Sequence, residues 1–227
     1  MKVSAIIPAA GLGLRFKSTI AKPLVLVNGE QIIIRTLKNL DSHPLINEII
    51  LVFNSKDIPQ VRDLFNIENI KKVTKVIEGG QTRTDSVRNG LKCLSLDTEL
   101  VLIHDGVRPF VDHQIITNVI KAALKSDAAI VAVPVKSTIK KVDLEKHEVE
   151  FTLNRKEIWE IQTPQVFKKD LILEAYDNSE GIDAPDDSFL VERLKHRVSL
   201  VEGSYFNIKI TTPEDLILAA EISKQIK

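Results

Sequence analysis

Short apolar, β-branched runs alternate along this chain with segments of helical spacing. This alternation is typical of a largely parallel sheet covered by helices on both faces. In such a sheet a ligand lies beyond the carboxyl ends of the strands, so the residues that follow each run are the candidates for a site. The expected strands are 3–7, 48–53, 73–77, 100–103 and 128–133, and the expected helices begin at 32 and cover 85–94 and 114–125.

Length and charge narrow the class of protein. At 227 residues the chain is expected to form one domain, 1–227. Its 31 basic and 31 acidic residues balance, which argues against capture of nucleic acid or of an anionic membrane surface. Cys93 is the single cysteine, so no internal disulfide forms, and we expect it to be a buried packing residue. No apolar run has transmembrane length and no signal peptide is evident, which predicts a cytoplasmic protein.

A glycine loop, 8–15, follows the first expected strand. Its small residues, with Gly11 and Gly13, allow backbone N–H groups to approach an anion closely. Arg15 and Lys22 add two cations suited to phosphate. The third glycine of the dinucleotide pattern is missing and no P-loop motif occurs. The loop by itself therefore leaves phosphate binding and a simple tight turn both open.

Polar residues also follow the third and fourth expected strands. Gly79-Gly80 begins a second turn that leads through Arg83 to Ser86, and either Thr84 or Asp85 could cap the helix after it. Asp105 follows the fourth strand, where an aspartate is often a turn residue. Opposite two phosphate-type loops it becomes a candidate ligand for Mg²⁺, which favours one or two carboxylates plus substrate phosphates.

Two further segments depart from the alternation. Residues 138–142 and 149–153 flank a polar stretch and predict a β-hairpin arm within 136–160. An isolated hairpin is marginally stable in water, so we expect it to pack on something, with a partner subunit as the natural candidate. Residues 207–212 predict a short strand before a final helix capped by Thr212, and Lys209 on that strand is expected to face an anion.

Taken together, these residues resemble the 2-C-methyl-D-erythritol 4-phosphate cytidylyltransferase family. The resemblance runs from the first strand to the last helix and implies the nucleotidyltransferase, Rossmann-like variant of the doubly wound, mostly parallel α/β sheet, with a protruding β-hairpin arm. The matching motifs are Pro8-Ala9-Ala10-Gly11, Gly79-Gly80, Asp85-Ser86, His104-Asp105-Gly106-Val107-Arg108-Pro109, the run 132–140, Trp159, Gln162-Thr163-Pro164-Gln165 and the run 201–209.

The resemblance implies transfer of CMP from CTP to methylerythritol phosphate, with release of pyrophosphate, in isoprenoid precursor biosynthesis. It also implies a divalent cofactor, Mg²⁺ or another such cation, and a homodimer formed through the arm. The implied catalytic cations are Arg15, Lys22 and Lys209, and the implied metal ligand is Asp105. The implied nucleotide-binding residues are Ala9, Ala10, Gly11, Gly13, Gly79, Gly80, Arg83 and Ser86. The implied substrate-binding residues are Arg108, Thr138 and Arg155, the latter two reaching across the dimer.

The chain departs from the family pattern in places. Pro185-Asp186-Asp187 stands where the family usually has Thr-Asp before a helix, which removes a possible hydroxyl contact. Leu14 replaces a second arginine of some members. Two alternatives remain: a ribitol 5-phosphate cytidylyltransferase, which shares much of the pattern, and a catalytically silent nucleotide-binding protein. The stretch 133–140 and Trp159 resemble the methylerythritol enzyme more closely, and the retained cations argue against a silent copy.

Overall fold

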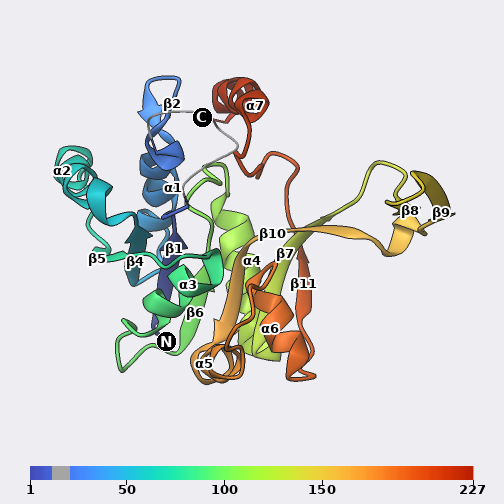
Figure 1. Cartoon of the computed structure of the whole chain (residues 1–227). Coiled ribbons are helices and arrows are strands. Elements are labelled where there is room, and N and C mark those ends of the chain that lie inside the picture. The colour runs from blue at the N-terminus through green and yellow to red at the C-terminus, as the bar shows by residue number, and fades with distance from the viewer. Residues whose placement is uncertain (12–20, 227) are drawn as a thin grey trace.

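The computed structural model describes residues 1–11 and 21–226, and a seven-stranded sheet forms its centre (Figure 1). In spatial order the strands are β11 (Ser199–Glu202), β7 (Ala128–Pro134), β10 (Trp159–Lys168), β6 (Leu100–Ile103), β1 (Val3–Pro8), β4 (Glu48–Phe53) and β5 (Val73–Glu78). Strand β10 is antiparallel to both of its neighbours, and the other pairs are parallel. The five strands expected from the apolar runs between residues 3 and 133 and the predicted mostly parallel sheet are confirmed.

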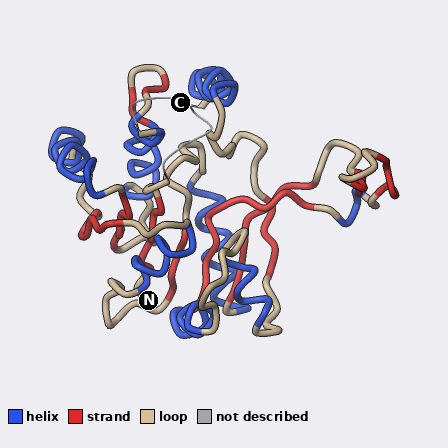
Figure 2. The backbone as a smooth tube through the Cα atoms, viewed as in Figure 1, coloured by secondary structure: helices blue, strands red, loops and turns tan. Residues whose placement is uncertain are grey.

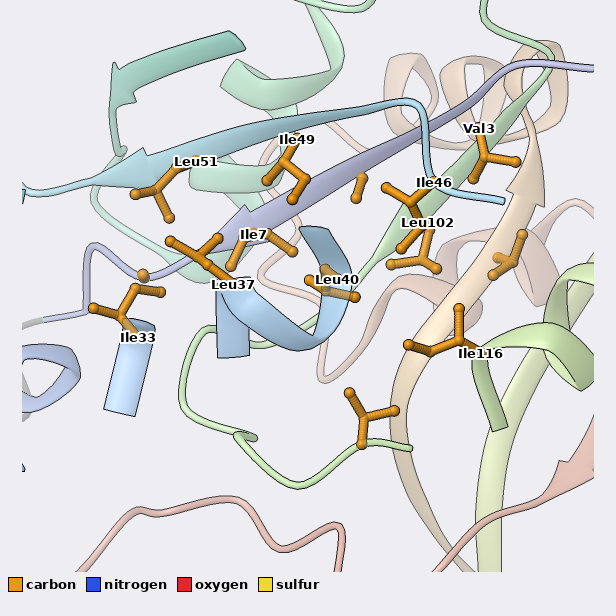
Figure 3. Close-up of a cluster of buried hydrophobic side chains, with 14 of the residues drawn as sticks. Val3, Ile7, Ile33, Leu37, Leu40, Ile46, Ile49, Leu51, Leu102 and Ile116 are labelled. Carbon is orange, nitrogen blue, oxygen red and sulfur yellow. The ribbon is translucent and has the colours of Figure 1, made fainter. Parts of the chain in front are cut away.

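Helices cover both faces of the sheet because successive strand residues point to opposite sides. Val3, Ala5 and Ile7 of β1 pack on one side, and Figure 3 shows part of this cluster. Ile6 joins a second cluster on the other side. The first cluster takes in α1 (Ile32–Asp41), α2 (Ile58–Glu68) and α4 (His113–Ser126), and the second takes in α3 (Arg83–Leu91), α5 (Lys169–Asp177) and α6 (Asp187–Arg193). The sheet is doubly wound, as expected.

Local capping decides where helix α3 begins. The backbone N–H of Asp85 donates to the Thr82 hydroxyl, and the Asp85 carboxylate accepts from the Thr82 N–H. This reciprocal pair is a capping box. The expectation that Thr84 or Asp85 is the cap was therefore wrong by two or three residues, although Asp85 is the cap's partner.

The C-terminal part of the chain differs from expectation in one respect. Residues 207–212 form no strand, because among the described residues no strand pairs with them, and their one backbone–backbone hydrogen bond to a distant segment runs from the Ile210 N–H to Val107 O, at 3.0 Å. Helix α7 (Pro213–Gln225) does begin after Thr212, as predicted. A third apolar cluster joins it to Val27 of β2 (Leu26–Val27), the strand that pairs with β3 (Glu30–Gln31).

The predicted hairpin is present and projects from the body, as Figure 2 shows. It consists of β8 (Lys140–Asp143) and β9 (Glu148–Thr152), and all but one of their residues are exposed. The chain returns to the sheet through a short 3-10 turn, η4 (Arg155–Glu157), and then β10. We name residues 136–160 the arm. Its outward position separates it from both apolar clusters that cover the sheet.

Three smaller points complete the fold. Two further 3-10 turns, η2 (Lys22–Leu24) and η3 (Ser55–Asp57), precede β2 and α2. Cys93 is half-buried, not buried as expected, because it follows the end of α3. No helix in 1–11 or 21–226 combines the length and the apolar character needed to cross a membrane.

Candidate functional site

A cavity of about 640 Å³ opens at the carboxyl ends of β1, β4, β5 and β6. This is the edge where ligands bind in open α/β sheets. The sheet order reverses direction around β1, since β4 lies on one side of it and β6 on the other. Of the predicted site residues, those that line the cavity are Ala9, Ala10, Gly11, Lys22, Gly79, Gly80, Arg83, Ser86, Asp105 and Lys209.

The two glycine turns come together on one wall of this cavity. A Cβ on Gly79 would lie 2.2 Å from the Cβ of Ala10, so only glycine allows the loops after β1 and β5 to meet. The Gly80 N–H donates to the Ser86 hydroxyl at 3.1 Å, and that hydroxyl donates to Thr82 O at 3.0 Å. Ser86 therefore holds the second turn in shape as well as lining the cavity.

Asp105 is the centre of a buried cluster of charges on the cavity floor. Its Oδ1 accepts from Arg83 Nε at 3.0 Å, and its Oδ2 accepts from Lys209 Nζ at 2.9 Å. Arg108 Nε lies 3.6 Å from Oδ2. Burial by itself would raise the pKa of the Asp105 carboxyl, but Arg83, Lys209 and Arg108 hold that pKa well below its usual range. Asp105 is therefore ionised throughout the physiological range.

A hydrogen-bonded relay fixes the backbone beneath Asp105. The Asp105 N–H donates to the Thr163 hydroxyl at 3.0 Å, and Thr163 Oγ1 lies 3.0 Å from His104 Nδ1. His104 Nε2 lies 3.0 Å from Arg108 O, which can only accept, so Nε2 carries the proton and Nδ1 accepts from Thr163. Burial lowers the pKa of His104 to about 4, and the imidazole is neutral. Strand β10 thus supports the loop after β6.

Arg108 lies behind the cavity and does not line it. Its Nη1 donates to the backbone oxygen of Asn207 at 2.7 Å, and burial lowers the pKa of its guanidinium although Asp105 is near. The Asn207 amide donates to Gln162 Oε1 and to Thr163 O. These bonds attach the segment that carries Lys209 to strand β10. Lys209 therefore reaches the cavity from an irregular segment and not from the expected strand.

Of the four remaining residues of the predicted set, two are undescribed and two lie on the arm. Gly13 and Arg15 fall in 12–20, outside the residues that the structure describes. Thr138 and Arg155 lie on the arm, where both are exposed, and neither lines the cavity; Figure 1 shows the arm projecting from the body of the fold. The Arg155 Nη1 donates to Lys136 O at 3.1 Å. One chain therefore does not bring these two residues to its own cavity.

The described residues of the cavity suit a divalent cation that is held by one carboxylate together with the phosphates of a substrate. Within 1–11 and 21–226 no group of three or more His, Cys, Asp or Glu side chains could hold a metal ion. Asp105 supplies one ionised carboxylate at the cavity floor. Because Mg²⁺ is commonly bound by one or two carboxylates plus substrate phosphates, Asp105 suits a metal that arrives with a triphosphate.

The sequence pattern did not reveal what holds Arg83. Its Nη1 and Nη2 donate to Asp187 at 3.1 and 2.7 Å, and the Tyr176 hydroxyl donates to the same carboxylate at 2.5 Å. Desolvation would lower the pKa of the Arg83 guanidinium, but Asp187 and Asp105 raise it well above its ordinary value. The only sequence signal for this pair was Asp187 itself, which lies about 100 positions from Arg83. An aspartate at the start of a helix is ordinarily interpreted as a cap, so the pattern did not indicate the ion pair.

Comparison with known proteins covers nearly the whole chain. The family model described as 2-C-methyl-D-erythritol 4-phosphate cytidylyltransferase matches residues 3–225. A protein of that name from Syntrophus aciditrophicus (strain SB) is 49% identical over 99% of this chain and 97% of its own length. One from Alkaliphilus oremlandii (strain OhILAs) is 45% identical over 98% of this chain and 95% of its own length.

Comparison with solved structures leads to the same family as the sequence comparison. The crystal structure of a 4-diphosphocytidyl-2C-methyl-D-erythritol synthase from Anaerococcus prevotii DSM 20548 superposes with a TM-score of 0.87 at 38% identity, covering 98% of this chain and 96% of that one. This chain therefore combines a match to the family model over nearly its whole length with three structural features: the central sheet, the glycine turns at its carboxyl edge and the protruding hairpin. This chain belongs to the 2-C-methyl-D-erythritol 4-phosphate cytidylyltransferase family.

Proposed function

We propose that this chain transfers CMP from CTP to 2-C-methyl-D-erythritol 4-phosphate, giving 4-diphosphocytidyl-2-C-methyl-D-erythritol and pyrophosphate for isoprenoid precursor biosynthesis. Its full-length membership of the family supports this activity. The observation that carries the proposal is the buried cluster in which Lys209 and Arg83 meet Asp105 on the floor of the strand-end cavity. Such a cluster suits a highly charged phosphate substrate.

The cavity is divided in a way that suits a nucleoside triphosphate. Ala9, Ala10, Gly79 and Ser86 form a wall of small residues, which would take the cytosine and the ribose. Gly11 and Lys22 lead toward the segment 12–20, where Gly13 and Arg15 would add backbone N–H groups and a guanidinium. The triphosphate would then extend from the glycine turns toward Lys209.

The reaction needs positioned charge more than covalent help. An oxygen of the methylerythritol phosphate attacks the α-phosphorus of CTP, the bond to the β-phosphate oxygen breaks, and pyrophosphate leaves with that electron pair. Lys209, Lys22 and Arg15 would stabilise negative charge on the α-phosphate and on the leaving group. Asp105 would hold a divalent cation that supplies further neutralisation of the phosphate oxygens when bound.

The second substrate would be held partly by another copy of the chain. The arm carries Val142, Leu144, Val149 and Phe151 exposed on a hairpin that has no core of its own. A partner subunit would cover these side chains, and Thr138 and Arg155 of one arm would reach the methylerythritol phosphate in the other subunit. Arg108, the remaining residue proposed for this substrate, is buried behind Asp105 and would act on that pocket through Asp105. The cytoplasm, where CTP is available, is the proposed location.

A pyrophosphate-release assay tests the proposal. The purified chain is incubated with CTP and Mg²⁺, and with either methylerythritol 4-phosphate or ribitol 5-phosphate. Release with the first substrate alone supports the proposal, and release with ribitol 5-phosphate alone contradicts the substrate while keeping the chemistry. Folded protein that releases no pyrophosphate with either substrate contradicts the enzyme proposal. Sedimentation at micromolar concentration tests the dimer separately, and a monomer would contradict the shared pocket.

A further inference from the structure

Asp187 is a fully buried carboxylate that no step of the proposed reaction uses. It is the first residue of α6, beneath the cavity and outside the cavity lining. Its Oδ1 accepts from Arg83 Nη1 and from the Tyr176 hydroxyl, and its Oδ2 accepts from Arg83 Nη2. A charge buried to this extent is costly unless it is fully paired, and Asp187 is fully paired.

Capping of α6 does not account for this carboxylate. Asp186 caps the helix, since its Oδ1 accepts from the Phe189 N–H at 2.9 Å. The backbone N–H groups of Asp187 and Ser188 donate to Gln165 Oε1, each at 3.1 Å. The orphan donors of the first turn are thus satisfied without the Asp187 side chain. Its remaining contacts lead to Arg83 and Tyr176.

The guanidinium of Arg83 is shared between two carboxylates. Asp187 takes both terminal nitrogens, and Asp105 Oδ1 takes only Nε, at 3.0 Å. The other oxygen of Asp105 is turned toward Lys209, which lines the cavity. A guanidinium prefers a bidentate pair with a carboxylate. Without the charge on Asp187, the free fork of Arg83 would be drawn to both oxygens of Asp105.

We propose that Asp187, supported by the Tyr176 hydroxyl, is a positioning residue that keeps Arg83 on one oxygen of Asp105 and leaves the other oxygen for the cavity. This inference rests on the proposed function, in which that oxygen serves a divalent cation bound with CTP. It assigns a role to Asp187, which lies in the stretch Pro185-Asp186-Asp187 where the chain only partly follows the family pattern. Substitution of residues behind a metal ligand typically lowers metal affinity or activity about 10- to 100-fold.

The test compares two neighbouring aspartates. Asp187→Asn keeps the side chain's size and removes the charge, and Asp186→Asn serves as the matched control because asparagine also caps helices well. Mn²⁺ binding in the presence of CTP is followed by electron paramagnetic resonance, without the second substrate. The Mg²⁺ concentration for half-maximal pyrophosphate release and the KM for CTP are measured alongside.

We expect Asp187→Asn to weaken Mn²⁺ binding and raise the Mg²⁺ requirement by about tenfold or more, while the KM for CTP at saturating Mg²⁺ changes much less. Asp186→Asn should leave metal binding within about twofold, the range of a remote change. Unchanged Mn²⁺ binding in folded Asp187→Asn, or an equal loss in Asp186→Asn, overturns the inference.

Two further experiments keep the test decisive. If Asp187→Asn does not fold, Tyr176→Phe decides, because it removes one hydroxyl and keeps the ring that packs in the core. A smaller weakening of Mn²⁺ binding in the same direction supports the inference, and no change contradicts it. If the wild-type chain binds Mn²⁺ with CTP but releases no pyrophosphate, the proposed reaction fails while the resonance measurement still tests the role of Asp187.

Discussion

The cavity floor and the arm use charged residues in opposite ways. Around Asp105, three cations and a second carboxylate, Asp187, are packed at the sheet edge; Asp105, Arg108 and Asp187 are buried, while Arg83 and Lys209 are partly open to the cavity. On the arm, Lys141 pairs with Glu150 at 2.7 Å, but both side chains stand in solvent. The first arrangement is held by burial and hydrogen bonds from several elements, whereas the second depends on two strands alone.

This contrast predicts that charged residues in the two regions affect different properties of the protein, namely folding stability at the cavity and association between chains at the arm. A buried ion cluster loses much when one partner is removed, because the remaining charges stay desolvated. An exposed pair loses little because water replaces the partner. The cavity should therefore respond to single substitutions through folding and catalysis, and the arm should respond through association between chains.

Asp105→Asn should produce the largest effect. It leaves Arg83, Arg108 and Lys209 without their shared carboxylate and should lower the free energy of unfolding by about 3–5 kcal/mol. Glu150→Gln on the arm is the matched control and should cost less than about 1 kcal/mol. Urea unfolding of both variants measures the difference, and equal losses would remove the contrast between the two regions.

Lys209→Ala should affect catalysis more than folding. Asp105 keeps Arg83 and Arg108, so the chain should fold, but the cation that faces the phosphates is lost. We expect kcat for pyrophosphate release to fall about 10²- to 10³-fold, as when one stabilising donor is removed from a developing charge. Lys224→Ala, which removes an exposed lysine of α7, is the control. Near-normal turnover in folded Lys209→Ala would place the chemistry elsewhere.

Acid should destabilise the cavity region first. The pKa of His104 falls from 6.5 to about 4 in the fold, so the unfolded chain takes up this proton first as the pH drops. Stability is present above about pH 6.5 and should decrease by roughly 2–3 kcal/mol down to pH 4. Asp105, whose pKa is also depressed, extends the loss to lower pH.

Urea midpoints at pH 7, 5.5, 4.5 and about 3 measure this dependence, the last of them in the range where the Asp105 part is lost. A stability that stays constant over that range would mean that His104 is not held neutral by burial. Asp105→Asn should keep the His104 part of the loss and lack the part at lower pH, which assigns each contribution to its group.

Phe151→Glu tests the arm. The substitution places a charge on its exposed apolar face, where a partner chain would pack. We expect the dissociation constant of the dimer to rise by about tenfold or more, which corresponds to a loss of about 1.4 kcal/mol or more of association free energy, with the monomer's thermal stability unchanged. Analytical ultracentrifugation and thermal unfolding measure the two. An unaltered dimer would mean that the arm does not form the interface.

Tyr205→Phe should have the smallest effect. The Tyr205 hydroxyl donates to Pro134 O at 2.6 Å at the base of the arm, and Lys136 Nζ lies 3.4 Å from the ring centroid. Because the ring remains and the site is partly exposed, the free energy of unfolding should fall by less than about 1 kcal/mol. A larger loss in urea unfolding would show that the arm is fastened to the body more firmly than its exposed contacts indicate.

Much of this could be predicted from the sequence because it is local. Apolar runs of β-branched residues indicated strands at 3–7, 48–53, 73–77, 100–103 and 128–133, and the structure has each of them to within one residue. The polar interruption at 143–148 indicated the hairpin. Glycine turns after two strands indicated the cavity wall. The expected strand at 207–212 was wrong because apolar alternation there reflects single contacts with the body, such as Ile210 with Val107, and no neighbouring strand.

The sequence by itself determined the succession of strands, turns and helices along the chain and the kinds of side chain at the sheet's carboxyl edge. Hydrophobic periodicity and turn residues act within a few positions, so they can be recognised without the fold. The tertiary structure alone decided that Asp187 and Tyr176 hold Arg83, that Thr163 orients His104, and that Arg108 lies behind Asp105 and not in the cavity. Those pairings join residues from different elements, and burial, which makes them strong, exists only once the sheet has formed.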